Sequence, residues 1–424
     1  MRKLVPSVVC LLMLKGTMDA QTPAAEQLTI LQALREAVLH NPSLHALSFE
    51  GAAADADIVT AGLRPNPSLS INGDLLPSDG YGPKQKQYGG SLILPFELGG
   101  KRDARLGAAS AAKSVTERRY EDAVRQTQFA VKNAYIDLTA AYVKTGVMRE
   151  SLVLLDSLVV LDSARVRGQD IPAVDLTRSE VERERFSLDV LANETSYRTT
   201  STALLGLLGR RGTEASVLVQ PDTTAISRVA SLIERPLPSI DSIVSIAAES
   251  RSDIRVLLAA EQAAQAQIAV AKSLASIDLS VSLDAMRQQE VTFWGASISF
   301  PLPIFDRHQG DIQRAEAMSA EAKAQTEAAL LQLRADIRGA MLDVEAKRES
   351  LRRLGTSILE KSKLVRSSVE YAYRRGSTSL VDFLDVARTE NELRELYVDA
   401  LAAYAKSLIN LDYVTGKDLF YVIQ

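Results

Sequence analysis

The chain has 424 residues, of which 46% are hydrophobic and only 5% aromatic, and its formal net charge is −4 at pH 7. That length is sufficient for two or three ordinary domains, and the small net charge argues against a nucleic acid as a partner. The low aromatic content argues against a thick globular core, whereas long stretches rich in Ala, Leu, Glu and Arg are typical of extended helices.

Residues 1–20 are predicted to be a secretory signal peptide. Arg2 and Lys3 supply its charged start, an apolar run follows, and Ala20 is a small residue at the expected cleavage site. The apolar run is too short to span a bilayer as a helix, and no later segment contains 18 consecutive apolar residues. Cys10, the only cysteine, lies inside this signal, so we expect a mature chain without disulfides.

The rest of the chain is predicted to be a tandem duplication. An offset of 210 residues aligns "GAAADADIVTAGL" with "EQAAQAQIAVAKS", and an offset of 206 aligns "YGGSLILPFELGGKR" with "WGASISFPLPIFDRH". Each half has a helix, two short alternating stretches, a very long helix, a polar turn and a returning helix. We therefore expect three segments after the signal: a first structural repeat (21–212), an equatorial connector (213–238) and a second repeat (239–424).

Four stretches alternate between apolar and polar residues, as strands with one face of each kind do. They are "SLSINGDL" (68–75), "YGGSLIL" (88–94), "SIDLSVSLDAM" (276–286) and "WGASISF" (294–300). An ordinary half-buried antiparallel sheet has the same pattern. In lipid, however, an open four-stranded sheet leaves its edges unsatisfied, and a closed membrane barrel needs at least about eight strands. A membrane location thus requires two, three or four copies of the chain.

Two segments, 102–167 and 311–375, are predicted to be very long helices, each on the order of 100 Å if continuous. Apolar residues recur in both with a seven-residue step, which predicts a left-handed supercoil. The residues on this step are Val124, Val131, Leu138, Leu152, Val159 and Val166 in the first segment, and Leu330, Ile337, Val344, Leu351, Ile358 and Val365 in the second. A soluble coiled coil has the same periodicity, so the helices alone leave that class open.

A similar phrase follows each long helix, "VRGQDIPAVDL" (166–176) in the first half and "YRRGSTSLVDFLD" (373–385) in the second. An offset of 208 residues places Gly168 on Gly376. Because glycine frees the backbone for a turn, we expect both phrases to form the ends of helical hairpins, with these two glycines in the turns.

The sequence resembles the TolC-like outer-membrane efflux proteins over essentially the whole mature chain. "ILPFELGGKR" and "FPLPIFDRHQG" are similar to the strand-to-helix joints of the CzcC-like, heavy-metal-exporting branch, and "YRRGSTSLVDFLD" is similar to the periplasmic tip of the family. The resemblance implies a mainly α fold with a small β part. Tandem-duplicated long helical hairpins would form a periplasmic tunnel, and four strands per chain would close a 12-stranded barrel in a homotrimer.

The same resemblance implies a passive outer-membrane channel in a tripartite efflux system, with metal cations as the substrate of its CzcC-like branch. The implied partners are two further copies of the chain, outer-membrane lipid, a periplasmic adaptor protein and an inner-membrane pump of the RND type. Two other interpretations stay open: the outer-membrane duct of a drug-efflux or type I protein secretion system, and a soluble periplasmic coiled-coil scaffold or adaptor.

The resemblance also assigns a periplasmic gate. Acidic residues ring the mouth of the channel in this family, and the matching positions are Asp382 and Asp385. The matching gate tyrosine is Tyr373, and we expect Asp175 to be the aspartate that opposes it. Helix N-capping after a turn is the alternative role for these aspartates.

One position departs from the family pattern. Thr378 stands where the gate arginine is expected, which leaves Arg374 and Arg375 as candidates to replace it. The exact bonding of the gate is therefore open at the level of sequence.

No catalytic, cofactor or metal site is predicted, so we expect a protein that is not an enzyme. His40 and His45 are badly spaced for one helical face, and His308 lies in a strand-to-helix joint. A transition-metal site in a chain without mature cysteines would need carboxylates from elsewhere. No glycine-rich phosphate loop has the required spacing.

Overall fold

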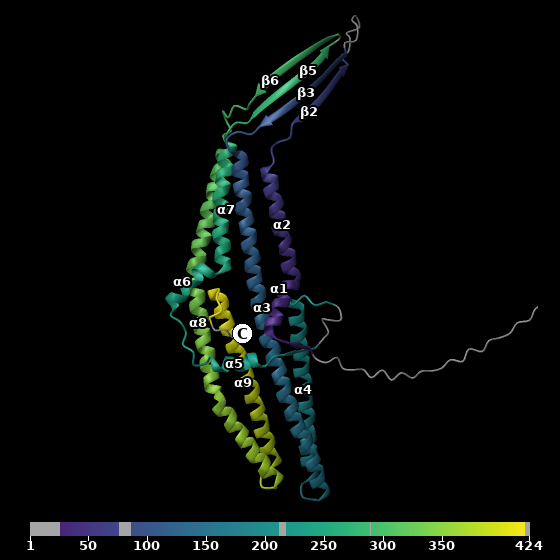
Figure 1. The fold of residues 1–424 in the computed structure, drawn as a ribbon. Coiled ribbons are helices and arrows are strands. Elements are labelled where there is room, and N and C mark those ends of the chain that lie inside the picture. Colours follow the sequence, from purple (N-terminus) through teal and green to yellow (C-terminus); the bar gives the residue numbers. More distant parts are fainter. Residues whose placement is uncertain (1–25, 76–85, 212–217, 289, 420–424) are drawn as a thin grey trace, which may run out of the picture.

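A computed structural model describes residues 26–75, 86–211, 218–288 and 290–419. The predicted signal peptide, residue 212 of the predicted first repeat and residues 213–217 of the predicted connector lie outside the described residues. Within the described ranges, the molecule is a wall of long helices that has a four-stranded sheet at one end and two hairpin turns at the other (Figure 1).

The order of elements repeats along the chain. The first half consists of β1 (Glu26–Leu28), α1 (Ile30–His40), α2 (Pro42–Gly62), β2 (Ser68–Leu75), β3 (Lys86–Phe96), α3 (Lys101–Arg167) and α4 (Ala173–Leu207). The connecting part contains β4 (Val219–Pro221) and α5 (Thr224–Ser231). The second half consists of α6 (Ile240–Ser250), α7 (Ser252–Leu274), β5 (Leu279–Gln288), β6 (Val291–Ser299), α8 (Gln309–Arg374) and α9 (Leu380–Thr415).

The four longer strands form one antiparallel sheet in the order β2-β3-β5-β6. One face of this sheet is polar and the other is apolar. One line of paired residues across the polar face is Ser70, Ser91, Asp284 and Gly295. The neighbouring line on the apolar face is Leu69, Leu92, Leu283 and Ala296. Ile71 and Trp294 on β2 and β6 are each 82% exposed, so the apolar face is uncovered in the single chain.

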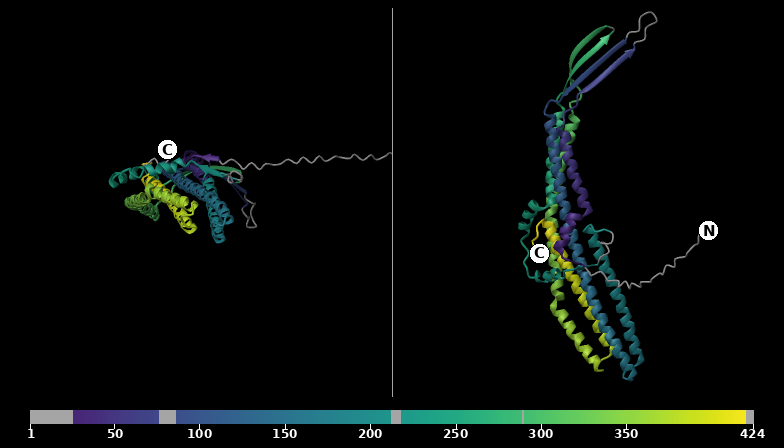
Figure 2. Two further views of the ribbon diagram at one scale, coloured as in Figure 1. Left: turned by 90° about the horizontal axis from the view of Figure 1, so that it is seen from below. Right: turned by 45° about the vertical axis from the view of Figure 1, so that its right-hand side comes forward.

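The helical wall continues the order of the sheet. Next to the sheet, α2, α3, α7 and α8 lie side by side, and farther away the order is α4, α3, α9 and α8 (Figure 1, Figure 2). One edge of the wall is thus formed by α2 and α4, and the other by α8 alone. The same two edges carry β2 and β6, the strands that end the sheet.

The seven-residue apolar rows are buried in the middle of the wall. The buried members are Val131, Leu138, Ile337, Val344 and Leu351, each at most 1% exposed. The first predicted helix is continuous as α3, but α8 is interrupted at Gly355, whose φ of 24° and ψ of 164° are not helical. Glycine allows this break because it has no Cβ to oppose a positive φ.

The core is thickest at mid-height, where short elements wrap the long helices. β1 and β4 pair in parallel there. Tyr135 of α3 is fully buried beneath them; its hydroxyl donates to the Leu28 carbonyl and accepts from the Asp222 N–H, both at 2.8 Å. Burial raises the pKa of Tyr135 to about 12, so the phenol keeps its proton and ties the connecting part to the wall.

Both halves also contain the same helix joint. Asn41 and Arg251 each end one helix and begin the next, with φ/ψ of −64°/121° and −66°/124°. Gly209 and Gly416 follow the returning helices in left-handed conformations, φ 80° and 71°, and press against these joints. A Cβ on Gly209 would lie 2.2 Å from the His40 carbonyl oxygen, and one on Gly416 would lie 3.0 Å from the Arg251 nitrogen. Only glycine permits this approach in either half.

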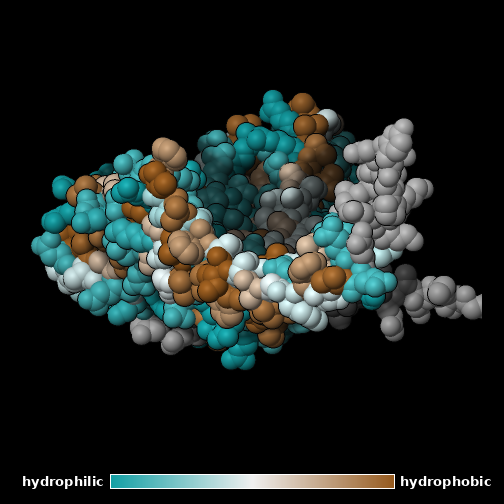
Figure 3. Space-filling model, turned by 90° about the horizontal axis from the view of Figure 1, so that it is seen from above, coloured by the Kyte–Doolittle hydropathy of each residue, from teal (hydrophilic) through white to brown (hydrophobic). Residues whose placement is uncertain are grey.

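The wall is curved. Seen from the sheet end, it bends around a hollow, and hydrophobic and hydrophilic side chains are interspersed around the rim (Figure 3). In the part of the chain that the structure describes, no helix combines the length and hydrophobicity of a membrane span.

Candidate functional site at the hairpin tips

Both hairpin turns lie at the end of the molecule opposite the sheet (Figure 1). In the first, the Gly168 N–H donates to the Ala164 carbonyl at 3.0 Å, and α4 begins after Pro172. Gly168 has an ordinary φ of −74°, and the left-handed residue is Gln169, with φ 66°. The turn forms at the predicted place. The positive φ expected at Gly168 is instead adopted by Gln169, for which this conformation is sterically unfavourable.

The second turn does use its glycine. Gly376 has φ 75°, and the Ser377 N–H donates to the Ala372 carbonyl at 2.9 Å. Ser379 then caps α9: its hydroxyl accepts from the Asp382 N–H at 3.1 Å, and the Asp382 carboxylate accepts from the Ser379 N–H at 3.4 Å. This reciprocal capping box satisfies two backbone donors. The second turn is therefore closed by side chains, whereas Pro172 offers no such cap to the first.

Tyr373, near the end of α8, joins the second hairpin to the first. Its hydroxyl donates to Oδ1 of Asp162 on α3 at 2.6 Å, and the two residues are 3% and 0% exposed. The other carboxylate oxygen of Asp162 accepts from the Ser179 hydroxyl on α4. Burial, and then the hydrogen bond to Asp162, raises the pKa of Tyr373, so the phenol remains a donor at neutral pH.

The predicted pairing of Tyr373 with Asp175 is wrong, because Asp162 holds the hydroxyl instead. Asp175 lies in the first turn of α4, and its carboxylate is 3.7 Å from Arg178 of the same helix. Negative charge is favourable at this end of a helix. A gating role for Asp175 itself stays a prediction.

Sequence reasoning missed Asp162 because it lies inside a long helix, outside the turn phrase. A signal was nevertheless present. Leu155, Leu158 and Asp162 follow the i, i+3, i+7 spacing of a buried helical stripe, and all three are at most 5% exposed. An acid on such a stripe requires a partner, since an unpaired buried charge is costly.

An arginine reaches Tyr373 from the first hairpin rather than from the second. Arg165 on α3 donates from Nη1 to the Tyr373 carbonyl at 3.2 Å, and its Cζ lies 5.3 Å from the centre of the tyrosine ring. The two sequence candidates contact their own helix: Arg374 pairs with Glu370 at 3.0 Å, and Cζ of Arg375 lies 4.5 Å from the centre of the Tyr371 ring. Arg165 is therefore the arginine that contacts Tyr373 from the other hairpin.

A second contact crosses between the returning helices. Arg388 on α9 donates from Nε and Nη2 to the two carboxylate oxygens of Glu182 on α4, at 2.7 and 2.6 Å. Glu182 is 5% exposed, and the Arg388 hydrogen bonds lower its pKa. A two-pronged pair of this kind fixes the orientation of both side chains as well as their distance.

Farther from the turns, the buried Glu390 on α9 forms ion pairs with two arginines. It pairs with Arg366 on α8 and with Arg394 at 3.1 Å, and Arg394 also reaches Glu150 on α3 at 3.1 Å. The Arg388–Glu182 and Arg394–Glu150 pairs therefore hold the two hairpins together in addition to the Tyr373 contact.

The two predicted ring residues are exposed and differ in their contacts. The Asp382 carboxylate accepts from the Ser379 hydroxyl at 2.7 Å and from the Thr378 hydroxyl at 3.2 Å. The hydrogen bonds from Ser379, and then that from Thr378, lower the pKa of Asp382. Asp385 follows one turn later on the same face and is also exposed. Asp382 thus does cap its helix, the alternative role foreseen for it, while the gating role of both residues stays a prediction.

No group of three or more His, Cys, Asp or Glu side chains is arranged to hold a metal ion in the described part of the chain. The acidic residues of the tips are instead distributed along helices and engaged with arginines, a serine and a tyrosine, as described above. The arrangement can hold two hairpins together and place negative charge at their ends.

Known proteins share this sequence pattern and this fold. The profile of the family described as "Outer membrane efflux protein" matches residues 33–210 and 243–417. The cobalt-zinc-cadmium resistance protein CzcC of Cupriavidus metallidurans is 25% identical over 401 residues, which are 93% of this chain and 91% of that protein. The nickel-cobalt-cadmium resistance protein NccC of Alcaligenes xylosoxydans xylosoxydans is 24% identical over 80% of this chain and 75% of that protein.

Solved structures agree at the level of the fold. A CusC structure superposes with a TM-score of 0.74 at 17% identity and covers 92% of both chains. The CmeC outer membrane channel of Campylobacter jejuni gives a TM-score of 0.74 at 16% identity over 92% of this chain and 86% of its own.

Proposed function

The chain belongs to the outer membrane efflux protein family, and from that premise we propose that three copies form one outer-membrane channel for metal cations. As a member of this family the chain is an efflux channel and not an enzyme, located in the outer membrane with a helical periplasmic extension. The trimer is supported by one observation: each chain has an open sheet of four strands above a curved helical wall. Three such sheets would supply twelve strands and leave no free edge.

The proposed partners are a periplasmic adaptor protein and an inner-membrane pump of the RND type. The channel holds no predicted energy-converting site, so transport through it would be passive and driven by the pump. The hairpin tips point away from the sheet, which would place them in the periplasm, where an adaptor can reach them. In this arrangement the pump selects the cargo and the channel supplies the exit.

Metal cations are the proposed substrate class for two reasons. The relatives similar to most of this chain are named for resistance to cobalt, zinc, cadmium and nickel. In addition, Asp382 and Asp385 are exposed at the tip of each second hairpin. Brought together around a threefold axis, they would form two stacked acidic rings, which attract cations and repel anions.

The closed state of this gate would rest on the contacts between the hairpins. Repulsion among the carboxylates of each ring opposes closure, so other bonds must hold the tips together. The buried Tyr373–Asp162 bond and the Arg388–Glu182 pair join the two hairpins of one chain and are suited to that role.

Deletion of the chain tests this function directly. The deleted strain should become more sensitive to cobalt, zinc, cadmium or nickel salts, and the intact chain should restore resistance. Sensitivity confined to organic drugs would favour a drug-efflux duct, and loss of a secreted protein would favour a type I secretion duct. A mature protein recovered in the soluble periplasmic fraction would contradict the channel itself.

A further inference from the structure

We propose that the free face of α8 in one copy packs against the outer face of α2 in the next copy, and that Glu327 and His45 meet across this seam. The inference rests on the proposed assembly of several copies and adds the residues that form its contact. It is derived from the seam that joins the two halves within a single chain.

The two halves have an equivalent contact in the upper wall. The offsets found in the sequence, 206 for the long helix and 210 for the helix before it, carry Lys113 and Asp55 onto Ser319 and Gln265. Both pairs are in contact: Lys113 Nζ lies 2.7 Å from Asp55, and the Ser319 hydroxyl donates to Gln265 at 3.1 Å. The α2–α3 packing of the first half is thus reproduced as α7–α8 in the second.

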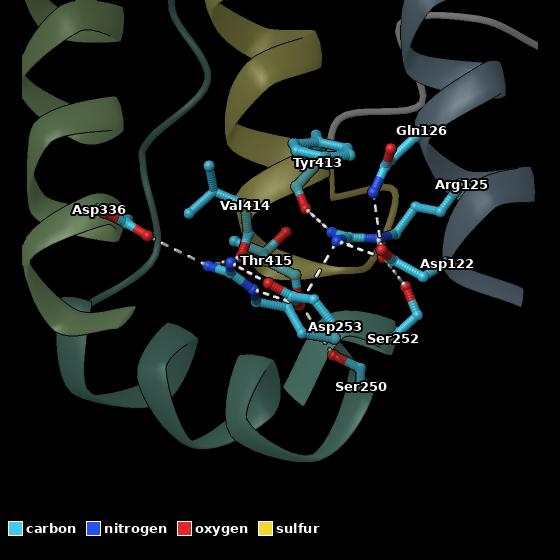
Figure 4. A network of polar contacts seen from close by, with 11 residues as sticks. Asp122, Arg125, Gln126, Ser250, Ser252, Asp253, Asp336, Tyr413, Val414 and Thr415 are labelled. Atoms are coloured by element: carbon cyan, nitrogen blue, oxygen red, sulfur yellow. Dashed lines mark hydrogen bonds and ion pairs between the residues drawn. The ribbon is translucent and has the colours of Figure 1, made fainter. Parts of the chain in front are cut away.

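The first half meets the second half along a further seam, between α3 and α7. Arg255 of α7 pairs with Glu121 of α3 at 3.2 Å. One turn away, the Ser252 hydroxyl donates to Asp122 at 2.7 Å. Figure 4 shows the lower part of this seam, where Asp122 and Arg125 of α3 face Ser252 and Asp253 at the start of α7.

The same offsets define a seam that no single chain can form. They carry Glu121 onto Glu327 of α8 and Arg255 onto His45 of α2. In one chain, α8 and α2 lie at opposite edges of the wall (Figure 1). If the repeat is continued around the hollow, the residue that faces Glu327 is therefore His45 of the next copy, and an imidazole takes the place of the guanidinium.

The positions equivalent to Asp122 and Arg125 of α3 are exposed and apolar in the single chain. They are Ala328 and Leu331 of α8, and Leu331 is 79% exposed. On α2, the position of the buried Ala259 of α7 is taken by Phe49, which is 63% exposed. The seam between copies would thus exchange the ionic contacts of the internal seam for hydrophobic burial.

A second copy fits this surface better than lipid or a foreign protein. The edges that carry α2 and α8 are also those that carry β2 and β6, so one rigid movement of a copy would pair both the helices and the strands. Ala317, Ala324, Ala328 and Ala335 are exposed along the corresponding face of α8. Small side chains of this kind let a neighbouring helix approach closely, as it does at Ala259 in the internal seam.

Cysteine crosslinking tests the seam. The starting protein is the full chain with Cys10→Ser, which removes the only cysteine. The His45→Cys/Glu327→Cys variant is treated in outer membranes with a short bifunctional thiol reagent and run on a denaturing gel. We expect a ladder that ends at three chains. The matched control, Glu121→Cys/Arg255→Cys, should react within one chain and stay at the mass of a monomer.

The possible outcomes distinguish the proposed α8–α2 seam from the proposed trimer. A detergent-solubilised variant that has the mass of a trimer but forms no ladder would overturn the proposed seam and leave the trimer intact. A variant of monomeric mass would overturn the trimer, and the seam with it.

Charge reversal gives an independent measurement. His45→Glu places two carboxylates together and should lower the temperature at which the trimer dissociates, and Glu327→Arg in the same chain should restore it. An equal loss in the single and double variants would overturn the pairing of these two residues.

Discussion

The two hairpin tips have the same plan, yet they contribute opposite kinds of group to two of the side-chain pairs that join them, Tyr373–Asp162 and Arg388–Glu182. The first tip supplies acceptors, Asp162 and Glu182, and the second supplies the donors that reach them, Tyr373 and Arg388. Divergence of a few polar residues converted two copies of one hairpin into a complementary pair, while the apolar stripe that makes each hairpin was retained.

The two turns also differ in the residues that form them. The second is closed by a left-handed glycine and a capping box, and the first by a left-handed Gln169 and a Pro172 without a side-chain cap. A helical hairpin needs only one residue that tolerates positive φ and a way to start the next helix, so different residues can satisfy these needs. The following predictions test this contrast, from the largest expected effect to the smallest.

Asp162→Ala should have the largest effect. It leaves the buried Tyr373 hydroxyl without its acceptor, at a cost of about 1–3 kcal/mol, and it removes one of the two acceptors of the Ser179 hydroxyl, which keeps the Asp175 carbonyl at 3.1 Å. We expect the paired hairpins to separate more easily, which should raise the open probability in planar bilayers. Asp175→Ala tests the other gate assignment: the Asp175 carboxylate holds neither hydroxyl, and its carbonyl, which accepts from Ser179, remains in the variant, so a smaller effect than that of Asp162→Ala is expected. Equal effects of the two substitutions would argue against the Tyr373–Asp162 hydrogen bond as the contact that keeps the gate closed.

Glu182→Gln should have an intermediate and pH-dependent effect. The pair with Arg388 lowers the Glu182 pKa below its usual 4.5, so its stabilisation is complete above that value and is lost as the pH falls through the lowered pKa. Because the Arg388 side chain is 40% exposed, we expect a cost of only about 1 kcal/mol at pH 7. Thermal denaturation in detergent should show the variant converging on the parent as the pH falls below 4.5 and through the lowered pKa. A constant difference across that range would exclude the ionic pair as its origin.

Gly376→Ala and Gly168→Ala compare the turns directly. A Cβ at Gly376, with φ 75°, imposes a left-handed strain of about 1–2 kcal/mol. Gly168 has φ −74°, so alanine there should cost less than about 0.5 kcal/mol. Limited proteolysis at the tips should therefore be faster for the first variant only. Similar cleavage rates would mean that the turns use their glycines alike.

Asp385→Asn should have the smallest effect on stability and a specific effect on conduction. Asp382 also caps α9, so its replacement mixes a structural loss with a loss of charge, whereas Asp385 lies one turn beyond the capping box. Removal of three charges from one ring should weaken cation selectivity and block by multivalent cations in planar bilayers. Unchanged reversal potentials and unchanged block would remove Asp385 from the gate.

Much of this architecture could be predicted because it depends on local periodicity. Alternating residues such as those of 279–285 predict a two-faced strand whatever lies beside it, and the row containing Ile337 and Val344 predicts a helix with one buried face. The turns at Gly168 and Gly376 were located for the same reason, since a polar interruption between two helical periods marks a hairpin. The duplication followed from the order of these local signals.

The pairings could not be predicted, because they depend on how distant segments are placed and rotated. The Tyr373 hydroxyl was free to meet Asp175 or Asp162 until the packing of the two hairpins turned Asp162 toward it, 211 positions away in the chain. The sequence pattern likewise could not predict the strand order β2-β3-β5-β6 or the break in α8 at Gly355. The sequence by itself determined which face of each element is apolar, because that face follows the local repeat. Only the tertiary structure decided which buried polar groups meet, because a hydrogen bond requires two atoms within about 3 Å and no local repeat encodes that distance.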